Sequence, residues 1–477
     1  LTRPPAPFLI GAAKPLARAY PAILLRGSGA RAFLNEVERL PRETTTALPL
    51  CSRLLTVHEP GSVVAQPDLK RAHARVETRL ATAERLATLA GLLGATYPSE
   101  ALDLAWRQVL YWSAPDRLGV AATERAYINA LAGYHEAAEW AGRVIRNATA
   151  YLASEADTLA KAPVDTTNVL ALVVANPCAQ PRTDVVTVEV FPEAVRALGV
   201  VDAAGAAVPY FPEAVQRTNA GAVHSVRLSF LARDVPALGY RTYYLVPRER
   251  FPRPVETDDP QIENDVFRVI VDRTSGDIVG LTDKRSDKEL AVGPLNRLLL
   301  LAEAPARMQG GRELWTTGER TTPGAATQIT AKTLEGVQRL EITAPLARGT
   351  LQRTLTLYDG LARIDCATRL RGVELDGRLL AMTFQPEHAG RALVCGERFG
   401  AVVGRPSVGT LDYRTEGMDN LSGTGVQPAQ RWAALSPNDH IQIGREGIVP
   451  LAPTAIVYGD GMQRAARRIQ EIGRAHV

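Results

Sequence analysis

The fold is decided in residues 124–176, which read ERAYINALAGYHEAAEWAGRVIRNATAYLASEADTLAKAPVDTTNVLALVVAN. Up to Leu152, apolar side chains recur at steps of three and four: Tyr127, Leu131, Tyr134, Ala138, Ala141, Ile145, Ala148 and Leu152. This is the period of an α-helix with one buried face. After Pro163 the period shortens to that of a β-strand. We therefore predict helices before Pro163 and strands after it.

Two further helices precede this one. The first starts at Asp68 and ends near Gly94, with an apolar stripe of Leu69, Ala72, Val76, Leu80, Ala83, Ala87 and Ala90. The second fits Ser99 to Ser113, with Ser99 as its N-cap. Pro115 ends it, because a proline disfavours helical geometry at the residue before it. Together the three helices predict an antiparallel three-helix bundle over residues 67–162.

The apolar positions of the helices also predict which residues form the core of the bundle. Five large side chains of the second and third helices fall on the predicted inner faces and should be largely buried: Trp106, Tyr127, Leu131, Tyr134 and Ile145. If Tyr134 and Ile145 were exposed instead, their face would belong to a partner. A second copy of the chain is one candidate for that partner.

The remainder of the chain reads as β structure. Strand-length runs separated by Pro, Gly and Asp are Leu170–Ala175, Val185–Val190, Val223–Leu231 and Tyr240–Val246. Around residues 351–366 polar and apolar positions alternate, with Leu351, Arg353, Leu355 and Leu357 on one face, and Asp359-Gly360 predicts a hairpin turn. The Pro-rich, acidic segment 253–260 predicts a junction. We expect an α+β multidomain protein with a small β-sandwich over 163–258 and a large one over 259–471.

The two ends of the chain do not share these patterns. Residues 1–66 are irregular, apart from a helix expected over Ala30–Leu40. The first residue is Leu1 rather than Met, so we expect a truncated or processed piece. The last six residues, IGRAHV at 472–477, resemble a translated sequencing adapter and are excluded from fold prediction.

Composition narrows the class of protein. Hydrophobic residues make up 46% and charged residues 22% of 477, as in folded globular proteins. The 55 Lys and Arg and the 51 Asp and Glu are spread along the chain, so the net charge of +4 argues against nucleic-acid binding. No apolar run is long enough for a membrane span. The four cysteines form no CxxC pair, which favours buried thiols and a cytoplasmic location.

A search for catalytic motifs finds no local signature. The seven histidines form no HxH, HxD or HExxH arrangement, so no local metal motif exists. There is also no GxSxG elbow and no Walker loop. From pattern alone the chain is a soluble multidomain protein without an identifiable active site.

Several segments nevertheless resemble one family. KRAHARVETRLATAERLATLAGLLGATYPSEALDLAWRQVLY from Lys70 and YINALAGYHEA from Tyr127 resemble the middle domain of glycoside hydrolase family 38, the α-mannosidases. VVANPCAQPRTDVVTVEV from Val173, ENDVFRVIVDRTSGDIVGLTDKRSDKEL from Glu263 and LTLYDGLARIDC from Leu355 resemble its β domains. They occur in the family's order and cover roughly residues 50–460. The resemblance implies a large β domain of the galactose-mutarotase-like kind.

The resemblance also implies a site. Family members carry a catalytic domain before the bundle, with a nucleophilic Asp and a zinc ion held partly by a His-x-Asp pair, and residues 1–66 would be a remnant of its end. One zinc ligand comes from the bundle, in a His-His-Asp stretch whose positions here are Ala114, Pro115 and Asp116. Asp116 matches the carboxylate that contacts sugar hydroxyls. Pro115 stands where the zinc-binding histidine would be and has no ligand atom to offer.

Two functions therefore stand at this point. The chain is the C-terminal part of a family 38 mannosidase that hydrolyses α-mannosides with retention, using two carboxylates about 5 Å apart and zinc in its intact relatives. Alternatively, it is a degenerate, noncatalytic homologue that serves carbohydrate contact or assembly. For the chain by itself we expect no catalytic residue, no metal ligand and no cofactor, with Asp116 as the one candidate substrate contact. A loop or helix-cap role for Asp116 is the simpler alternative.

Overall fold

The computed structural model describes residues 67–118, 123–158, 169–309, 312–374 and 378–386, together with shorter pieces outside these ranges. The chain divides into two compact units, residues 1–55 and 56–477. In the first unit the described element is α2 (Ala30–Glu38), which matches the helix expected there. Its Phe33 and Leu34 are more than half exposed.

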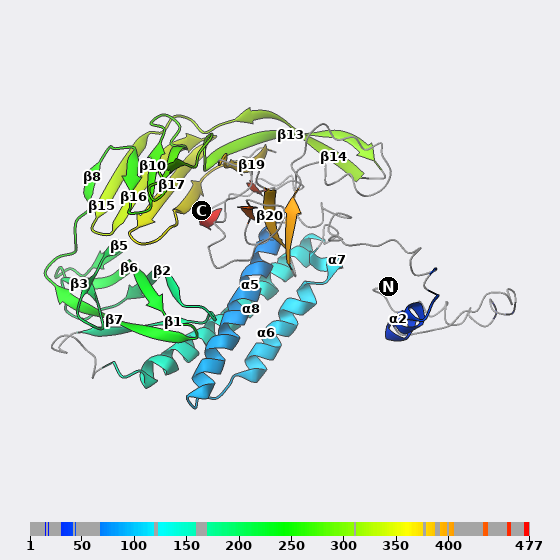
Figure 1. Cartoon of the computed structure of the whole chain (residues 1–477), viewed down its shortest axis with the longest axis horizontal. Helices are drawn as coiled ribbons and strands as arrows, with labels where there is room; N and C mark the ends of the chain where they lie inside the picture. Colours follow the sequence, from blue (N-terminus) through cyan, green and yellow to red (C-terminus); the bar gives the residue numbers. More distant parts are fainter. Residues whose placement is uncertain are drawn as a thin grey trace. The chain divides into compact units, whose positions relative to one another are not determined.

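Three long helices open the second unit (Figure 1). They are α5 (Pro67–Leu92), α6 (Ser99–Trp112) and α8 (Glu124–Glu155), and the short helix α7 (Pro115–Leu118) lies between the last two. Their apolar stripes meet in one buried cluster that includes Leu69, Leu80, Val109 and Tyr134. The helices therefore pack on one another along the faces that the helical period predicts.

The helix ends show how local sequence stops each element. Thr123 caps α8 by accepting a hydrogen bond at Oγ1 from the Ala126 amide, at 3.3 Å. Gly94, just beyond α5, has a φ of +110°, which a side chain would oppose. The prediction for Ser99 was wrong by one residue, because Pro98 is the N-cap of α6 and no side chain caps it. A proline ring can precede the helix, but it offers no acceptor for the free amides.

The predicted inner-face residues are buried to different degrees. Tyr127 is 4% exposed and Tyr134 is 1% exposed. Trp106, Leu131 and Ile145 are partly buried and pack against the same cluster. None of the five is exposed, so this face is already covered within the chain and does not require a partner.

Residues 169–251 form the small β region, which contains two antiparallel sheets. One has the order β1-β7-β3-β4, from β1 (Leu170–Asn176), β7 (Gly239–Arg248), β3 (Ala197–Asp202) and β4 (Ala207–Val208). The other has the order β2-β6-β5, from β2 (Arg182–Val190), β6 (Val223–Val235) and β5 (Tyr210–Arg217). A shared core that includes Leu198, Phe230 and Leu245 joins them. No helix occurs between Val173 and Val271, a stretch that the structure describes throughout.

The large β region begins at residue 255. Its longest sheet has the order β24-β18-β17-β16-β15-β8, from β24 (Ile472–His476), β18 (Asp365–Arg371), β17 (Gly349–Tyr358), β16 (Val337–Leu346), β15 (Gln328–Leu334) and β8 (Val255–Thr257). A second sheet, β12-β11-β10-β9, contains β12 (Lys288–Glu289), β11 (Ile278–Asp283), β10 (Phe267–Val271) and β9 (Gln261–Glu263). Leu340, Leu355 and Val269 belong to their common core.

Two smaller sheets complete this region. The hairpin of β13 (Arg297–Gln309) and β14 (Arg312–Thr321) pairs with β19 (Arg378–Thr383), which pairs with β23 (Ile456–Tyr458) (Figure 1). The fourth sheet contains β21 (Gly400–Gly404), β20 (Ala392–Glu397) and β22 (Ala433–Ser436). Every pair of strands in the described residues is antiparallel, and the α+β class is confirmed. The part of the chain that is described contains no helix apolar and long enough to cross a membrane.

Two predicted boundary segments take part in sheets. Val255–Thr257, inside the predicted junction 253–260, pairs with β15 as an edge strand. Ile472–His476, inside the predicted adapter tail, pairs with β18. The proposed origin of that tail and the predicted domain bounds stay predictions.

The hairpin predicted at Asp359-Gly360 is confirmed. β17 and β18 pair antiparallel from Thr350↔Arg371 to Thr356↔Asp365, and Gly360 has a φ of +79° in the connection. The connection is longer than a two-residue turn, because Asp359–Ile364 lie outside both strands. The alternation also holds: Leu351, Leu355 and Leu357 are buried on one face, and Arg353 shares that face.

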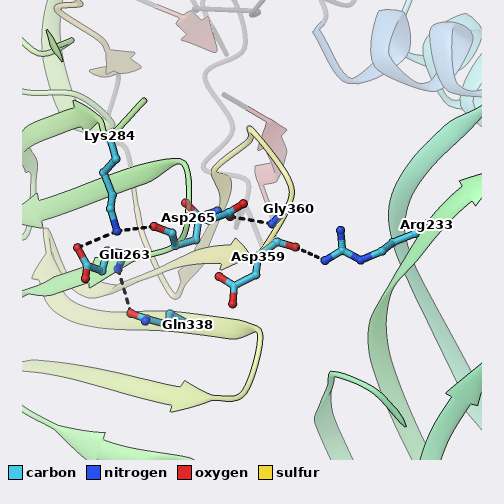
Figure 2. A pocket seen from close by; sticks show the side chains of 8 residues that line it. Arg233, Glu263, Asp265, Lys284, Gln338, Asp359 and Gly360 are labelled. Atoms are coloured by element: carbon cyan, nitrogen blue, oxygen red, sulfur yellow. Dashed lines mark hydrogen bonds and ion pairs between the residues drawn. The ribbon is translucent and has the colours of Figure 1, made fainter. Parts of the chain in front are cut away.

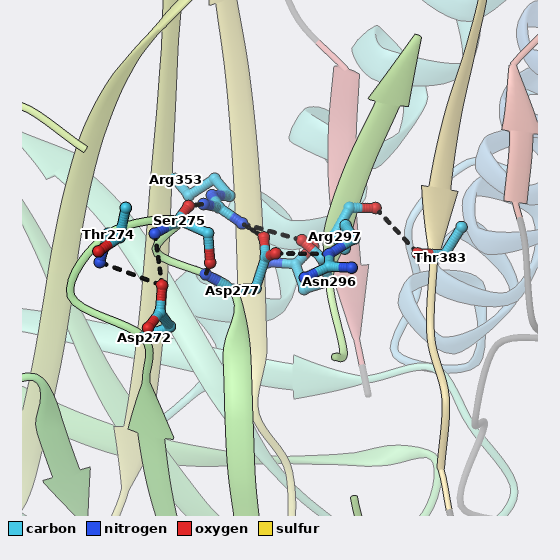
Figure 3. A network of polar contacts seen from close by, with 8 residues as sticks. All are labelled: Asp272, Thr274, Ser275, Asp277, Asn296, Arg297, Arg353 and Thr383. Atoms are coloured by element: carbon cyan, nitrogen blue, oxygen red, sulfur yellow. Dashed lines mark hydrogen bonds and ion pairs between the residues drawn. The ribbon is translucent and has the colours of Figure 1, made fainter. Parts of the chain in front are cut away.

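Arg353 is buried in the large β region at 1% exposure (Figure 3). Its Nη1 donates to Asp277 Oδ1 at 2.9 Å and to the Asn296 carbonyl at 3.1 Å, and its Nη2 donates to the Ser275 carbonyl at 2.5 Å. Asp277 also accepts from Arg297 Nε at 2.6 Å. Burial lowers the pKa of Arg353, and the Asp277 carboxylate opposes that shift. The network ties β17 to the turn before β11 and to the start of β13.

A β junction, where the small and large β regions meet, is part apolar and part ionic. Its apolar cluster contains Phe211, Leu231, Leu334, Val337 and Tyr358. Arg339 on β16 donates to both carboxylate oxygens of Glu213 on β5, at 2.7 and 2.8 Å. Arg363 pairs with Asp184 on β2 at 2.9 Å. The two β regions are therefore joined by paired charges as well as by packing.

Candidate functional site

The first candidate site lies at one end of the three helices. Because α6 runs antiparallel to both α5 and α8, the start of α5, the end of α6 and the start of α8 meet there, and α7 follows α6 at the same end (Figure 1). Asp116 belongs to α7. The side chains of Pro115 and Asp116 lie outside the described part of the structure, so the role predicted for Asp116 stays a prediction.

The backbone around Asp116 is held by its neighbours. Pro115 is the first residue of α7, a position that suits its fixed φ. Arg117 Nη1 donates to the Tyr111 carbonyl at 2.6 Å, and its guanidinium lies 3.7 Å from the centre of the Tyr111 ring. Lys70 Nζ on α5 donates to the Leu118 carbonyl at 3.1 Å. Thus α7 is fixed from both α5 and α6.

Two further polar groups lie at this end. Tyr127 Oη donates to Asp68 Oδ2 at 3.3 Å, linking the first turns of α8 and α5. His73 is 3% exposed, and its ring meets Tyr134 edge-on at 5.4 Å between centroids. Its Nε2 lies 3.6 Å from Glu77 Oε1. His73 is therefore a packed helix residue rather than an open ligand.

The donor set does not fit the zinc ion that the family resemblance implies. Within the described ranges, no group of three or more His, Cys, Asp and Glu side chains is placed to hold a metal ion. A catalytic zinc needs about three protein ligands. The position that matches the family histidine is Pro115, whose ring carries no donor atom.

The second candidate site is a polar pocket of about 460 Å³ next to the β junction (Figure 2). The lining residues come from β6, from the end of β9, from the β9–β10 and β17–β18 connections, from β16 and from the residue after β11: Arg233, Glu263, Asn264, Asp265, Lys284, Gln338, Asp359 and Gly360. Its volume lies in the range of about 300–1,000 Å³ that is usual for small-molecule sites.

Asn264 organises the base of this pocket and is 5% exposed. Its Nδ2 donates to the carbonyls of Tyr358 and Leu361, at 2.8 and 3.2 Å, and its Oδ1 accepts from two amides of the following turn. The Gly360 amide donates to Asp265 Oδ1 at 2.7 Å. These bonds hold the β9–β10 and β17–β18 connections together.

Charges of both signs surround the pocket. Glu263 accepts from Arg268 Nε at 3.2 Å and lies 3.4 Å from Lys284 Nζ. Burial raises the pKa of Glu263, but the bonds and charges of Arg268 and Lys284 lower it by more, so the net shift is downward. Glu263 is therefore ionised at neutral pH and already paired.

The sequence predicted the first candidate site, which stays a prediction, and did not predict the second. Glu263, Asn264 and Asp265 were seen only as part of a segment that resembles the family, and Asp359-Gly360 only as a turn. The available signal was a Glu-Asn-Asp run directly after a short strand, since loop polar residues often carry function. Arg233 lies 126 residues from Asp359, to whose carbonyl its Nη2 donates at 2.6 Å, and no local pattern links them.

Comparison with known proteins finds similarity in structure. No family model and no curated protein matches the sequence. An alpha-mannosidase from Enterococcus faecalis matches the structure with a TM-score of 0.59 and 15% identity, over 84% of this chain and 52% of that chain. A protein in glycosyl hydrolase family 38 from Enterococcus faecalis matches with a TM-score of 0.57 and 15% identity, over 84% and 53%. The likeness shows a shared fold.

The extent of the match matters for function. This chain spans about half the length of the two solved structures. The family suggested by the sequence segments thus reappears, independently, among the structural neighbours. Activity, substrate and metal content do not follow from a shared fold.

Proposed function

We propose that this chain is the part of a mannosidase-like glycoside hydrolase of family 38 that follows the catalytic domain, with Asp116 contributing one contact to an α-mannoside. The observation that carries the proposal is the fold likeness over 84% of the chain to an alpha-mannosidase and to a family 38 protein. The sequence segments that resemble the family lie between the start of α5 and the start of β18.

In this proposal the chain contributes one carboxylate and the backbone that positions it, rather than a complete active site. The backbone of α7 is anchored by Lys70 and Arg117, which holds residue 116 next to the end of α6 and the start of α5. A carboxylate there accepts hydrogen bonds from sugar hydroxyls. The nucleophile and the acid-base group would come from outside the chain, and no step is assigned to zinc.

The second candidate function is noncatalytic: carbohydrate contact or assembly by a degenerate homologue. Pro115 favours it, because the substitution removes the imidazole that the family uses at this position. Truncation alone would leave that loop unaltered. The two functions differ in whether a supplied catalytic domain, together with Pro115→His, restores hydrolysis.

The first experiment uses the whole chain. We expect no stoichiometric zinc by elemental analysis after dialysis and no hydrolysis of an aryl α-mannoside, for both the native chain and Pro115→His. One restored imidazole beside Asp116 makes two ligands where about three are needed. Stoichiometric zinc with turnover in the native chain would contradict this expectation.

The second experiment joins the chain to the catalytic domain of the Enterococcus faecalis alpha-mannosidase. We expect hydrolysis only in the hybrid that carries Pro115→His, and loss of that activity when Asp116→Asn is added. Asp103→Asn, at an exposed position of α6, is the matched control and should change nothing. Inactivity of every hybrid that folds would favour the noncatalytic function.

A further inference from the structure

The pocket beside the β junction has hydrogen-bonding groups that the fold does not use. The Asp359 carboxylate makes no hydrogen bond or ion pair with any described residue, although its own backbone is held at both ends. Asp265 uses one oxygen, Oδ1, for the Gly360 amide. Gln338 uses its Oε1 for the Glu263 amide at 2.9 Å, which leaves its NH₂ group as a donor.

The donors and acceptors are mixed around one opening. Lys284 and Arg233 each donate one bond to a carbonyl, of Asn264 and Asp359, and each has further N–H groups. Figure 2 shows these side chains around a common space, with Arg233 approaching from β6 and the others from the large β region. The three carboxylates and two cations of the lining almost balance.

This mixture of donors and acceptors indicates which class of ligand fits the pocket. A site of carboxylates alone favours a cation, and a site of lysine and arginine alone favours an anion. A hydroxyl group donates one hydrogen bond and also accepts, so a ligand with several neighbouring hydroxyls satisfies free carboxylate oxygens and free N–H groups at once. The lining has no aromatic residue, so stacking on a sugar ring does not contribute.

The site is also preformed. Asn264, with four hydrogen bonds from its side chain, fixes the two connections that carry Asp265 and Asp359. Because the backbone positions are set without a ligand, binding does not require ordering a loop, and less affinity is lost to that ordering.

We propose that this pocket binds a neutral carbohydrate, with vicinal hydroxyls donating to Asp359 and Asp265 and accepting from Lys284, Arg233 and Gln338. It is a second contact, formed by other residues than Asp116 and independent of hydrolysis. Only the choice of a mannoside as the first probe rests on the proposed function.

The test measures binding of methyl α-mannoside, an α-linked mannobiose and maltose to the whole chain, by saturation-transfer NMR and calorimetry. Asp359→Ala should weaken binding about tenfold or more, because it removes a charged hydrogen-bond acceptor. Its fold should be intact, since the carboxylate bonds to no described residue, and an unchanged melting temperature checks this. Glu139→Gln, which removes an exposed carboxylate from α8, is the control and should bind as the native chain does.

Each outcome decides between the two proposals. Binding of any of the three sugars that is lost in Asp359→Ala and kept in Asp116→Ala supports the pocket, whether or not mannoside hydrolysis is ever found. Binding lost only in Asp116→Ala overturns the pocket and supports the proposed substrate contact. No binding of any sugar up to high millimolar concentration, or equal binding by Asp359→Ala and the native chain, also overturns the pocket.

Discussion

Two arginines, Arg353 inside the large β region and Arg339 at the β junction, are both buried against a carboxylate. Arg353 is 1% exposed and shares Asp277 with Arg297, and its Nε has no hydrogen-bond partner among the described residues. Arg339 is 9% exposed and donates to both carboxylate oxygens of Glu213, with the Phe211 ring 3.8 Å from its guanidinium carbon.

The difference appears in their pKa values. Burial lowers the pKa of both arginines. For Arg353 burial prevails, while for Arg339 the bonds and charge of Glu213 outweigh burial and the pKa rises. Two hydrogen bonds to one carboxylate compensate the loss of water, and a single hydrogen bond to a carboxylate that a second arginine also uses does so less completely. Arg353 is therefore a costly group within a core, and Arg339 a well-paired group that joins two regions.

The largest effect should come from removing Arg353. Arg353→Met leaves the carbonyls of Ser275 and Asn296 without their donor and Asp277 with Arg297 alone, so we expect a loss of about 3–5 kcal/mol in the free energy of unfolding. Calorimetry and chemical unfolding measure it. A loss below that of Glu213→Leu, which removes the partner of Arg339, would reverse the comparison.

Removing the partner of Arg339 should cost somewhat less. Glu213→Leu leaves a buried guanidinium unpaired, for a loss of about 2–4 kcal/mol. Because the pair joins two regions, we also expect the single calorimetric transition to broaden or split. If the transition kept its width and midpoint, the ion pair would not couple the small and large β regions.

The next effect should be a change in how the stability of the protein depends on pH. It should come from Asp272, in the turn that supplies the Ser275 carbonyl to Arg353. The backbone amide of Ser275, with a smaller contribution from Thr274, lowers the pKa of Asp272, against the effect of burial. A lowered pKa adds stability above the unfolded value of about 3.9, and this is lost as the pH falls through the folded pKa.

Asp272→Asn removes this titration. Its unfolding midpoint in urea should therefore depend less on pH below about 4 than that of the native chain. Asp258→Asn, in the exposed segment before β9, is the control. An unchanged pH profile in Asp272→Asn would mean that the turn does not depend on the charge of this carboxylate.

The smallest effect should come from an exposed arginine pair. Arg348 and Glu374 lie 3.1 Å apart with side chains that are 78% and 40% exposed. Arg348→Ala should change the free energy of unfolding by about 0–1 kcal/mol, and less at high salt. A loss as large as that of Glu213→Leu would show that burial does not explain why the ion pair of Arg339 stabilises the protein more than that of Arg348.

Much of this fold could be predicted from local pattern. Steps of three and four placed α8 to within a few residues, and the stop at Pro163 separated helices from strands. Leu351, Leu355 and Leu357 alternate with polar neighbours and lie on the buried face as predicted. The Ser99 cap failed because Pro98 and Ser99 both suit a helix start, and local pattern does not choose between adjacent residues.

The two candidate sites also differ in whether the sequence could predict them. Asp116 could be selected because a family resemblance aligned it, and its place at the helix end follows from two helices that run antiparallel. The pocket could not be foreseen, because Arg233, Lys284, Gln338 and Asp359 come from separate strands and connections.

The sequence by itself determined the kind and the approximate extent of the long helices and of the strands with clear alternation, because helix and strand periods are set by near neighbours along the chain. Only the tertiary structure decided which polar side chains meet. Arg353 reads in the sequence as one member of an apolar face, and its partners Asp277 and Asn296 lie 76 and 57 residues away. Such contacts depend on how whole sheets pack, and local spacing carries no information about them.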